Sequence, residues 1–106
     1  MSVQDTSMQA YLQIIPEIGE RQTIVLIAIK ELCYKFDDCT DQEIRRHLQK
    51  AEPNYVRPRR FELVNDIKVV IEARKRECKV TGRLAKAWKI DQQRLDKMIL
   101  KNHGVK

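Results

Sequence analysis

No apolar run in this sequence approaches the roughly 20 residues that a helix needs to cross a bilayer. The N-terminus also lacks a positively charged region followed by an apolar segment, which is the pattern of a secretory signal. These two absences predict a soluble protein of the cytoplasm that makes no contact with a membrane.

Cysteine is scarce, and the three residues present, Cys33, Cys39 and Cys78, include no Cys-x-x-Cys pair. An odd and widely spaced set favours reduced thiols over a disulfide framework. A zinc site formed by these thiols and His47 is the alternative, but the spacing rules for zinc ligands favour it much less. We expect no metal and no other cofactor.

The patterns of common catalytic sites are missing as well. The sequence has no glycine-rich loop for a phosphate, no His-Glu metal pair and no nucleophile beside a plausible base. Asp37, Asp38 and Asp41 could form a metal-binding cluster, but a loop that caps a helix explains these carboxylates more simply. We therefore expect a protein that is not an enzyme.

What the sequence has in excess is positive charge in one half. Residues 1–50 carry six Lys and Arg against eight Asp and Glu, a net charge of −2, whereas residues 51–106 carry fifteen against seven, a net charge of +8. Clustered cations bind nucleic acids because they release the counterions condensed on the phosphate backbone. The second half therefore predicts a face that binds a polyanion, with an ordinary solvated surface as the alternative.

A chain of 106 residues has room for one modest core, so we expect a single domain over residues 1–106. Its first 19 residues should form a helical extension, because Met8, Tyr11, Leu12 and Ile15 recur at helical spacing. This apolar stripe could lie on the core of its own chain or against a second copy.

Residues 20–36 contain no Gly or Pro and predict the main core helix. Ile24 and Ile27 widen its apolar surface beyond one stripe, so this helix should be covered on more than one side. The stripe itself consists of Val25, Leu26, Ile29, Leu32, Cys33 and Phe36.

A short helix and a basic helix should follow. Thr40-Asp41-Gln42-Glu43 matches the capping box that starts a helix, and Ile44 and Leu48 fall on one face of that helix. After a tight corner, the arginine-rich residues 54–66 predict the basic helix, docked by its apolar edge with its arginines facing outward. Pro58 is tolerated near the first turn, which leaves the start of this helix open by a few residues.

The remaining residues predict a hairpin and a tail. Residues 69–71 are β-branched and begin a strand, Thr81-Gly82 is a turn signal, and residues 84–90 form the returning strand. In the tail, residues 91–106, three apolar side chains on one helical face are expected to pack on the core helix or on a partner. These are Leu95, Met98 and Ile99.

In this order the elements resemble the winged helix-turn-helix DNA-binding domain over about residues 20–90. Three segments look like those of small phage and prokaryotic members: Gly19-Glu20-Arg21-Gln22 with Val25-Leu26, Thr40-Asp41-Gln42-Glu43-Ile44, and the run from Thr81 to Trp88. The chain differs at Asp66-Ile67-Lys68, where a glycine often separates the recognition helix from the strand. The resemblance implies a mostly α fold with a small β-hairpin (α+β): a winged helix-turn-helix with short flanking N- and C-terminal helices.

The resemblance also implies a function. A sequence-specific double-stranded DNA-binding protein, acting as a transcriptional regulator, would place residues 54–66 in the major groove and residues 74–83 on the backbone or in the minor groove. Arginine and amide side chains suit base edges, whereas the cations of the hairpin suit phosphates. The predicted contact residues are Asn54, Tyr55, Arg57, Arg59 and Arg60 in the helix and Lys75, Arg76, Lys79, Thr81 and Arg83 in the hairpin.

Several alternatives stay open. The protein could be a winged-helix module that binds other proteins, or an architectural protein that binds DNA without sequence preference. The flanking helices could join two copies in a homodimer. Among the contact residues, Arg60 could lie along the core with only its tip exposed, and Lys75 and Lys79 could be ordinary solvated side chains.

Overall fold

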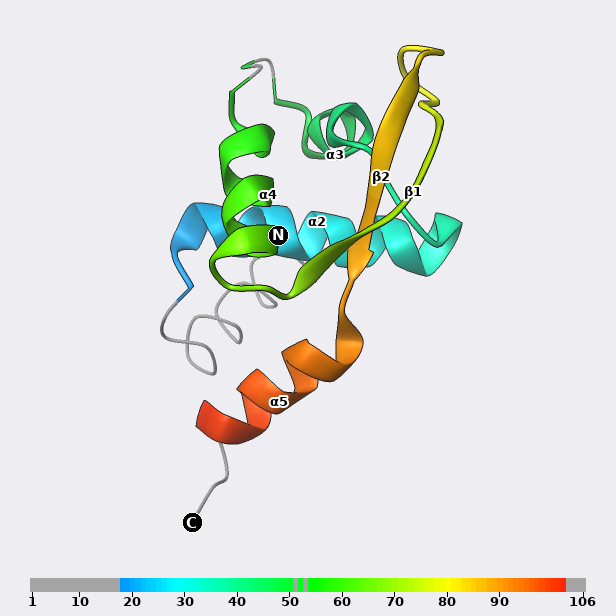
Figure 1. Cartoon of the computed structure of the whole chain (residues 1–106). Coiled ribbons are helices and arrows are strands. Elements are labelled where there is room, and N and C mark those ends of the chain that lie inside the picture. Colours follow the sequence, from blue (N-terminus) through cyan, green and yellow to red (C-terminus); the bar gives the residue numbers. More distant parts are fainter. Residues whose placement is uncertain (1–17, 51, 53, 103–106) are drawn as a thin grey trace.

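The computed structural model describes residues 18–50, 52 and 54–102, which form an α+β fold of four helices and one antiparallel hairpin (Figure 1). Helix α2 runs across the middle of the molecule in this view, with α3 above it and α5 below it, and the hairpin extends from below α2 to beyond α3. The N-terminal helix expected around residues 8–15 lies outside the described residues. The elements are α2 (Glu20–Phe36), α3 (Asp41–Leu48), α4 (Val56–Asn65), β1 (Val70–Glu77), β2 (Leu84–Ile90) and α5 (Gln92–Asn102).

Helix α2 has the bounds that the sequence predicts, and it forms the centre of the core. Ile27 and Ile29 point in nearly opposite directions on a helix, yet their exposed fractions are 3% and 0%. The helix is therefore covered on more than one side, as its wide apolar surface predicts. Phe36 departs from the expected stripe, because it lies in the last turn of α2 and keeps 47% of its surface exposed.

The capping box at the start of α3 is formed as predicted. Thr40 Oγ1 accepts a hydrogen bond from the Glu43 N–H at 3.3 Å, and Glu43 Oε1 accepts one from the Thr40 N–H at 3.1 Å. Ile44 is fully buried and Leu48 packs against the core. Gln49 then adopts a left-handed conformation with φ of 57°, which ends the helix.

Helix α4 begins at Val56, two residues after the predicted start, and ends one residue before the predicted end. Pro58 is its third residue, and the amides of a first helical turn have no partner within the helix, so the proline removes no hydrogen bond. Val56 and Leu63 are buried and dock α4 in the core next to α2.

The junction between α4 and β1 has no glycine, and Lys68 takes the conformation that a glycine would have. Its φ of 66° lies in the left-handed region that glycine occupies without steric cost. Two bonds close the end of the helix around it. The Ile67 N–H donates to the Glu62 carbonyl at 2.9 Å, and the Val69 N–H donates to the Leu63 carbonyl at 2.9 Å. The chain then turns directly into β1.

The hairpin is anchored to the rest of the fold through Trp88 in β2. Its backbone exchanges two hydrogen bonds with Cys39, at 3.0 and 2.7 Å, in an isolated β-bridge that lies beyond the hairpin itself. The Trp88 side chain is buried beside Ala87. At the tip, Gly82 has φ of 73°, which is the turn that Thr81-Gly82 predicts.

Helix α5 packs on the same core, as one of the two expectations for the tail proposes. Leu95 is fully buried, and Met98 and Ile99 are partly buried against the core. The Asp91 N–H donates to the Val69 carbonyl at 2.8 Å and holds the start of α5 beside the start of β1. Within the described ranges, none of the helices combines the length and the apolar character needed to span a membrane.

Candidate functional site

A β-bulge interrupts β1 between the base of the hairpin and its cationic outer half. The pairing register shifts between Glu72 and Arg74, so Ala73 is an extra residue without a partner of its own in β2. Beyond this bulge, Lys75 pairs directly with Lys86. Directly paired residues place their side chains on the same face of a hairpin, so the two ammonium groups project from one face.

Lys75 and Lys86 bring like charges to opposite positions of a ladder, which is destabilising unless a counter-charge is near. Both residues are exposed, with 53% of the Lys86 side chain open to solvent. Lys86 Nζ forms an ion pair with Glu72 Oε1 at 3.9 Å, which is too long for a hydrogen bond and offsets the repulsion in part. An anion bound between the two ammonium groups would relieve their repulsion, so this face is a candidate site for a phosphate.

The arginines on the other face of the hairpin turn toward the protein. Arg74 and Arg76 each donate to Asp38 at 2.7 Å. Arg76 also donates to both carboxylate oxygens of Glu43, at 2.7 and 2.9 Å. Burial opposes ionisation of Glu43, but hydrogen bonds from Arg76 and from backbone amides lower the pKa of this carboxyl to about 2. Burial likewise raises the pKa of Asp38, and the two arginines outweigh it and hold the pKa below its usual value.

Arg76, a predicted DNA contact, is thus engaged within the protein, with 14% of its side chain exposed. Its ion pairs join the hairpin to Asp38 before α3 and to Glu43 inside α3. A contact of Arg76 with DNA stays a prediction, and it would require these ion pairs to open.

Arg60 is also held within the protein. It donates through Nε and Nη2 to the two oxygens of Asp41, at 2.9 and 2.7 Å. Its Cζ lies 4.1 Å from the centroid of the Trp88 ring, and 13% of its side chain is exposed. This placement matches the alternative in which the arginine lies along the core, and it connects α4 with α3 and β2.

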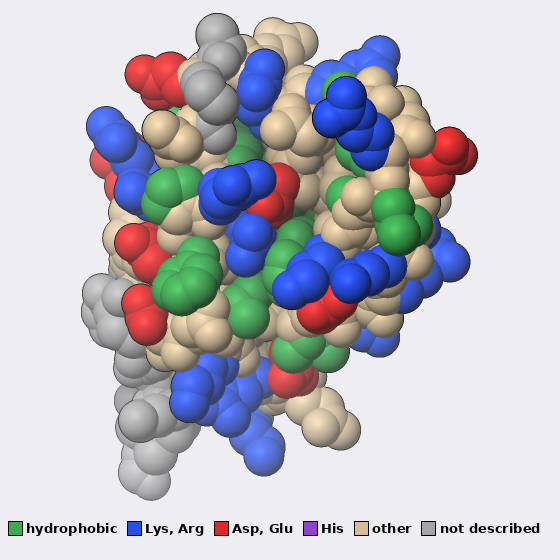
Figure 2. Space-filling view, turned by 45° about the horizontal axis from the view of Figure 1, so that its top comes forward, with side chains coloured by type: hydrophobic (Ala, Val, Ile, Leu, Met, Phe, Trp, Pro, Cys, Tyr) green, Lys and Arg blue, Asp and Glu red, His purple; other side chains and the backbone are tan. Residues whose placement is uncertain are grey.

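Arg57 lies on the exposed side of α4 and meets the hairpin at a hollow of about 240 Å³. Its side chain is 74% exposed, and the Asp41 carboxylate at 4.0 Å is already bound by Arg60. Figure 2, in which the top of the molecule comes forward, shows Lys and Arg side chains distributed over that side with hydrophobic side chains between them. The hollow is lined by Thr40, Asp41, Gln42, Arg57, Arg60, Cys78, Thr81, Ala85, Lys86 and Trp88.

Three other predicted contact residues gather elsewhere. Asn54, Tyr55 and Arg59 line a second hollow of about 310 Å³ together with Arg21. Tyr55 is half-buried, and this burial raises the pKa of its hydroxyl. Arg59 has 25% of its side chain exposed and lies 3.4 Å from Glu62. The structure therefore separates these residues from Arg57.

The tip of the hairpin carries Lys79, Thr81 and Arg83, all of which are exposed. Lys79 Nζ lies 3.7 Å from the centroid of the Phe36 ring, and the Lys79 N–H donates to Glu43 at 2.8 Å. Thr81 Oγ1 accepts a hydrogen bond from the Arg83 N–H at 3.2 Å, which shapes the turn. Of the three, Thr81 also lines the hollow with Arg57.

Lys86 and Gln42 are two residues of this hollow with polar side chains suited to a phosphate or a base, and neither is among the predicted contact residues. The position of Lys86 opposite Lys75 depends on the register that the turn gives to the hairpin, which the turn signal at Thr81-Gly82 does not fix to one residue. A cation in the returning strand was the one available signal. Gln42 lies in the first turn of α3, and its place in the hollow depends on how α3 packs beside the hairpin.

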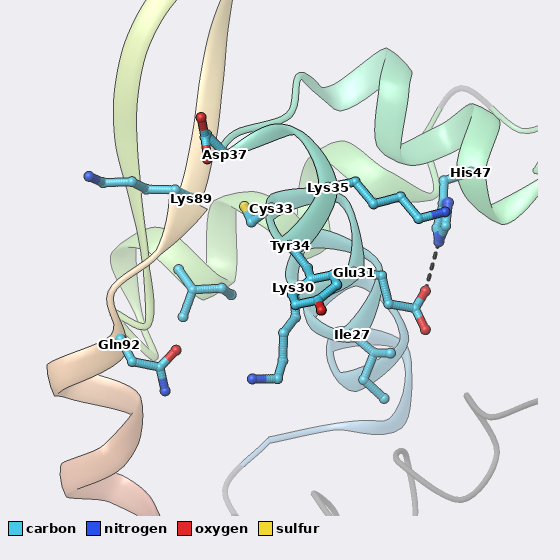
Figure 3. A pocket seen from close by; sticks show the side chains of 11 residues that line it. Ile27, Lys30, Glu31, Cys33, Tyr34, Lys35, Asp37, His47, Lys89 and Gln92 are labelled. Atoms are coloured by element: carbon cyan, nitrogen blue, oxygen red, sulfur yellow. Dashed lines mark hydrogen bonds and ion pairs between the residues drawn. The ribbon is translucent and has the colours of Figure 1, made fainter.

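A larger hollow, of about 850 Å³, lies along α2 near the end of β2 and the start of α5 (Figure 3). Tyr34, which is 92% exposed, lies on it, and His47 Nε2 meets Glu31 Oε1 at 2.7 Å at its edge. Cationic and anionic side chains alternate around it, including Lys89 and Asp37. It contains none of the predicted contact residues.

The described part of the chain contains no group of three or more His, Cys, Asp or Glu side chains that could hold a metal ion. The thiols of Cys33 and Cys39 instead contact the Trp88 carbonyl at 3.7 and 3.8 Å. Cys78 Sγ lies 3.0 Å from Thr40 Oγ1. All three cysteines are free.

Comparison with known proteins assigns no family to the chain. No protein-family model matches it, and no curated protein matches it. The chemistry of the site consists of an exposed guanidinium group, two paired ammonium groups and the ion pairs beneath them.

Proposed function

We propose that the protein binds double-stranded DNA as a winged helix-turn-helix domain, with α4 in the major groove and the hairpin as the wing. The observation that carries this proposal is the grouping of Arg57, Lys75 and Lys86. Arg57 and Lys86 line one hollow, and Lys75 stands opposite Lys86. The order of elements supports it too, since α2, α3 and α4 are followed by a hairpin whose second strand pairs with Cys39 before α3.

Helix α4 has a suitable size and an exposed reading group. Its ten residues span about 15 Å, and the major groove of B-DNA is about 12 Å wide and admits a helix. Arg57 carries an exposed guanidinium group that could pair with O6 and N7 of a guanine. In this proposal Arg57 reads a base edge.

The hairpin supplies the contacts with the DNA backbone. Lys75 and Lys86 would hold a phosphate between them, which relieves the repulsion described above. Lys79, Thr81 and Arg83 at the exposed tip would add further contacts with phosphates or the minor groove.

Arg60 and Arg76 act as positioning residues in this proposal. Arg60 ties α4 to α3 through Asp41, and Arg76 ties the hairpin to α3 through Glu43. The two ion pairs hold the reading helix and the wing against the same short helix. A fixed distance between these elements would let both engage one stretch of duplex together.

Sequence-specific binding would make the protein a transcriptional regulator, and a location in the cytoplasm suits its three free thiols.

A salt titration tests the binding. If about six phosphates are neutralised, the logarithm of the affinity should fall with the logarithm of the salt concentration with a slope of about −5. A flat salt dependence, or no binding at low salt, would contradict the proposal. Selection from a random pool of duplexes separates specific binding from architectural binding without sequence preference.

The hollow along α2 favours a second candidate function, the binding of another protein. Tyr34 is a nearly fully exposed aromatic side chain on that hollow, and such side chains are enriched in protein interfaces. A Tyr34→Ala variant should bind DNA like the wild type if the two surfaces are independent.

A homodimer through the flanking helices would read half-sites about one helical turn apart, and sedimentation with and without DNA tests for it.

A further inference from the structure

We infer that Phe61 contacts the 5-methyl group of a thymine in the major groove and thereby gives α4 a preference for a T at one position of its site. This inference rests on the proposed binding of α4 in that groove. The inference adds to the proposed function the recognition of one base that no charged residue of the site selects.

Phe61 is an exposed aromatic side chain in the middle of the proposed reading helix. It keeps 55% of its surface exposed, although Val56 and Leu63 of the same helix are buried at 2% and 0%. Residues four apart share a face of a helix, so Phe61 lies one turn beyond Arg57 on the outward side. Asn65 lies one further turn on, and its Nδ2 donates to the Phe61 carbonyl at 3.0 Å.

No carboxylate of α4 shares the outward face with Phe61. The one carboxylate within α4 is that of Glu62, which is only partly exposed. Glu62 accepts a hydrogen bond from Gln22 at 2.8 Å and lies 3.4 Å from Arg59, so it is turned to the other side of the helix. The outward face of α4 therefore offers a guanidinium group, an aromatic ring and an amide, a combination that phosphates do not repel.

Two other exposed aromatic side chains have a different setting. The ring of Phe36 is covered by Lys79 Nζ at 3.7 Å, and Tyr34 lies on the hollow along α2. Phe61 is held by a helix that Arg60 clamps to α3, so its backbone is fixed before any partner binds. A ring presented in this way loses little conformational freedom when it makes contact.

The chemistry of the major groove points to thymine as the partner of this ring. Thymine is the one base that presents a methyl group there, and an apolar side chain such as Phe is a usual contact for it. Arg57 and Phe61 are separated by about 6 Å along the helix axis, and successive base pairs are about 3.4 Å apart. The preferred site should therefore hold a guanine and a thymine about two base pairs from each other.

The test uses the duplex that the protein selects from a random pool, remade with deoxyuridine in place of one thymine at a time. Deoxyuridine keeps the pairing and removes the methyl group. Wild-type protein should bind about fourfold more weakly at one or two positions, the loss that corresponds to one buried methyl group. Phe61→Ala should bind the unmodified duplex more weakly and show no further loss at those positions. Leu84→Ala removes another exposed apolar side chain, in the hairpin, and should keep the wild-type response to deoxyuridine.

Each other outcome overturns the inference in a distinguishable way. If Phe61→Ala keeps the wild-type loss at every position, another side chain reads the methyl group. If the wild type is insensitive to deoxyuridine everywhere, no methyl group is read. If Phe61→Ala changes the sedimentation of the free protein, the ring faces a second copy instead. If the wild type binds no duplex at low salt, the proposed function fails first and the inference fails with it.

Discussion

Lys75 stands directly opposite Lys86 in the antiparallel ladder, and both side chains are exposed. Like charges on opposite positions repel, and the Glu72 carboxylate at 3.9 Å from Lys86 Nζ offsets only part of this repulsion in the free protein. A duplex would convert the same pairing into a favourable contact with a phosphate. If the proposed binding of DNA is correct, this charge arrangement would be more favourable in the complex than in the free protein.

Replacement of Lys75 or Lys86 by Ala should weaken the binding of preferred and random duplexes alike, because phosphate contacts carry no sequence information. The slope of the salt dependence should become shallower by about one unit for each lost contact. Lys89→Ala is the matched control, since Lys89 is exposed on β2 and lines the hollow along α2. An equal effect of Lys89→Ala would place the DNA on a different face.

Replacement of Arg57 by Ala should cost about 1–3 kcal/mol of binding free energy on the preferred duplex and relax the preference at one base position. Competition with scrambled duplexes measures both effects. Arg59→Ala should leave the base preference intact, because Arg59 lies in the other hollow with 25% of its side chain exposed. If Arg59→Ala relaxes the base preference and Arg57→Ala does not, then Arg59 is the residue that reads the base. Thermal melting of both variants checks that each remains folded.

Arg76→Ala should lower the free energy of unfolding by about 3–5 kcal/mol, because it leaves buried Glu43 without its ion-pair partner and removes one of the two arginines that bind Asp38. Asp38 and Glu43 have only 6% and 9% of their side chains exposed. Arg74→Ala is the control, since it shares Asp38 but has 60% of its own side chain exposed. The control should cost less than about 1 kcal/mol in urea denaturation. Similar losses for the two variants would show that burial of the pair does not govern its strength.

The stability of the fold should decrease in acid as Glu43 is protonated. The pKa of Glu43 is lowered from 4.5 to about 2 in the folded state. Its ionised form therefore stabilises the fold fully above about pH 4.5, and this contribution is lost as the pH falls toward 2. Glu43→Gln keeps a residue that completes the capping box and should make the unfolding free energy less dependent on pH between 2 and 5. An unchanged acid profile in this variant would assign the loss to other carboxyls.

Lys68→Gly should raise the free energy of unfolding by about 1 kcal/mol, because a left-handed conformation costs a non-glycine residue about that much. Lys68 has φ of 66° and an exposed side chain, so little packing is lost. Lys68→Ala keeps the strain and should give no such gain in chemical denaturation. Equal stability of the two variants would show that the junction relaxes around any residue.

The parts of the fold that were predictable are those that depend on neighbours in the chain. The absence of Gly and Pro predicted α2, the Thr40 capping box predicted the start of α3, and Thr81-Gly82 predicted the turn of the hairpin. Each of these patterns lies within one continuous stretch of the chain, and the elements begin or turn where the patterns predict. The left-handed Lys68 was not predictable, because a lysine carries a steric cost in this conformation and no local pattern of the sequence indicates it.

The candidate site was predictable in composition but not in orientation. Arg57 is exposed as expected of the basic helix. Arg60 and Arg76 bind carboxylates of the protein that lie 19 and 38 residues away along the chain. Their orientation could not be predicted, because local patterns do not show which distant residues meet. Phe61 differs from the expectation in the opposite sense: an apolar residue in a helix is expected to be buried, and this one is exposed. Its exposure follows from where Val56 and Leu63 dock.

The bulge at Ala73 affects the direction of the hairpin without affecting which of its cations share a face. Every pair on either side of the bulge would survive the loss of this one residue, since Glu72 already pairs with Trp88 and Arg74 with Ala87. What would disappear is the local bend and extra twist that a bulge gives to its strand. A chain without Ala73 would keep the same cations on the same face and aim them elsewhere, so the position of the tip relative to α4 can be altered by the length of one strand while its chemistry stays constant.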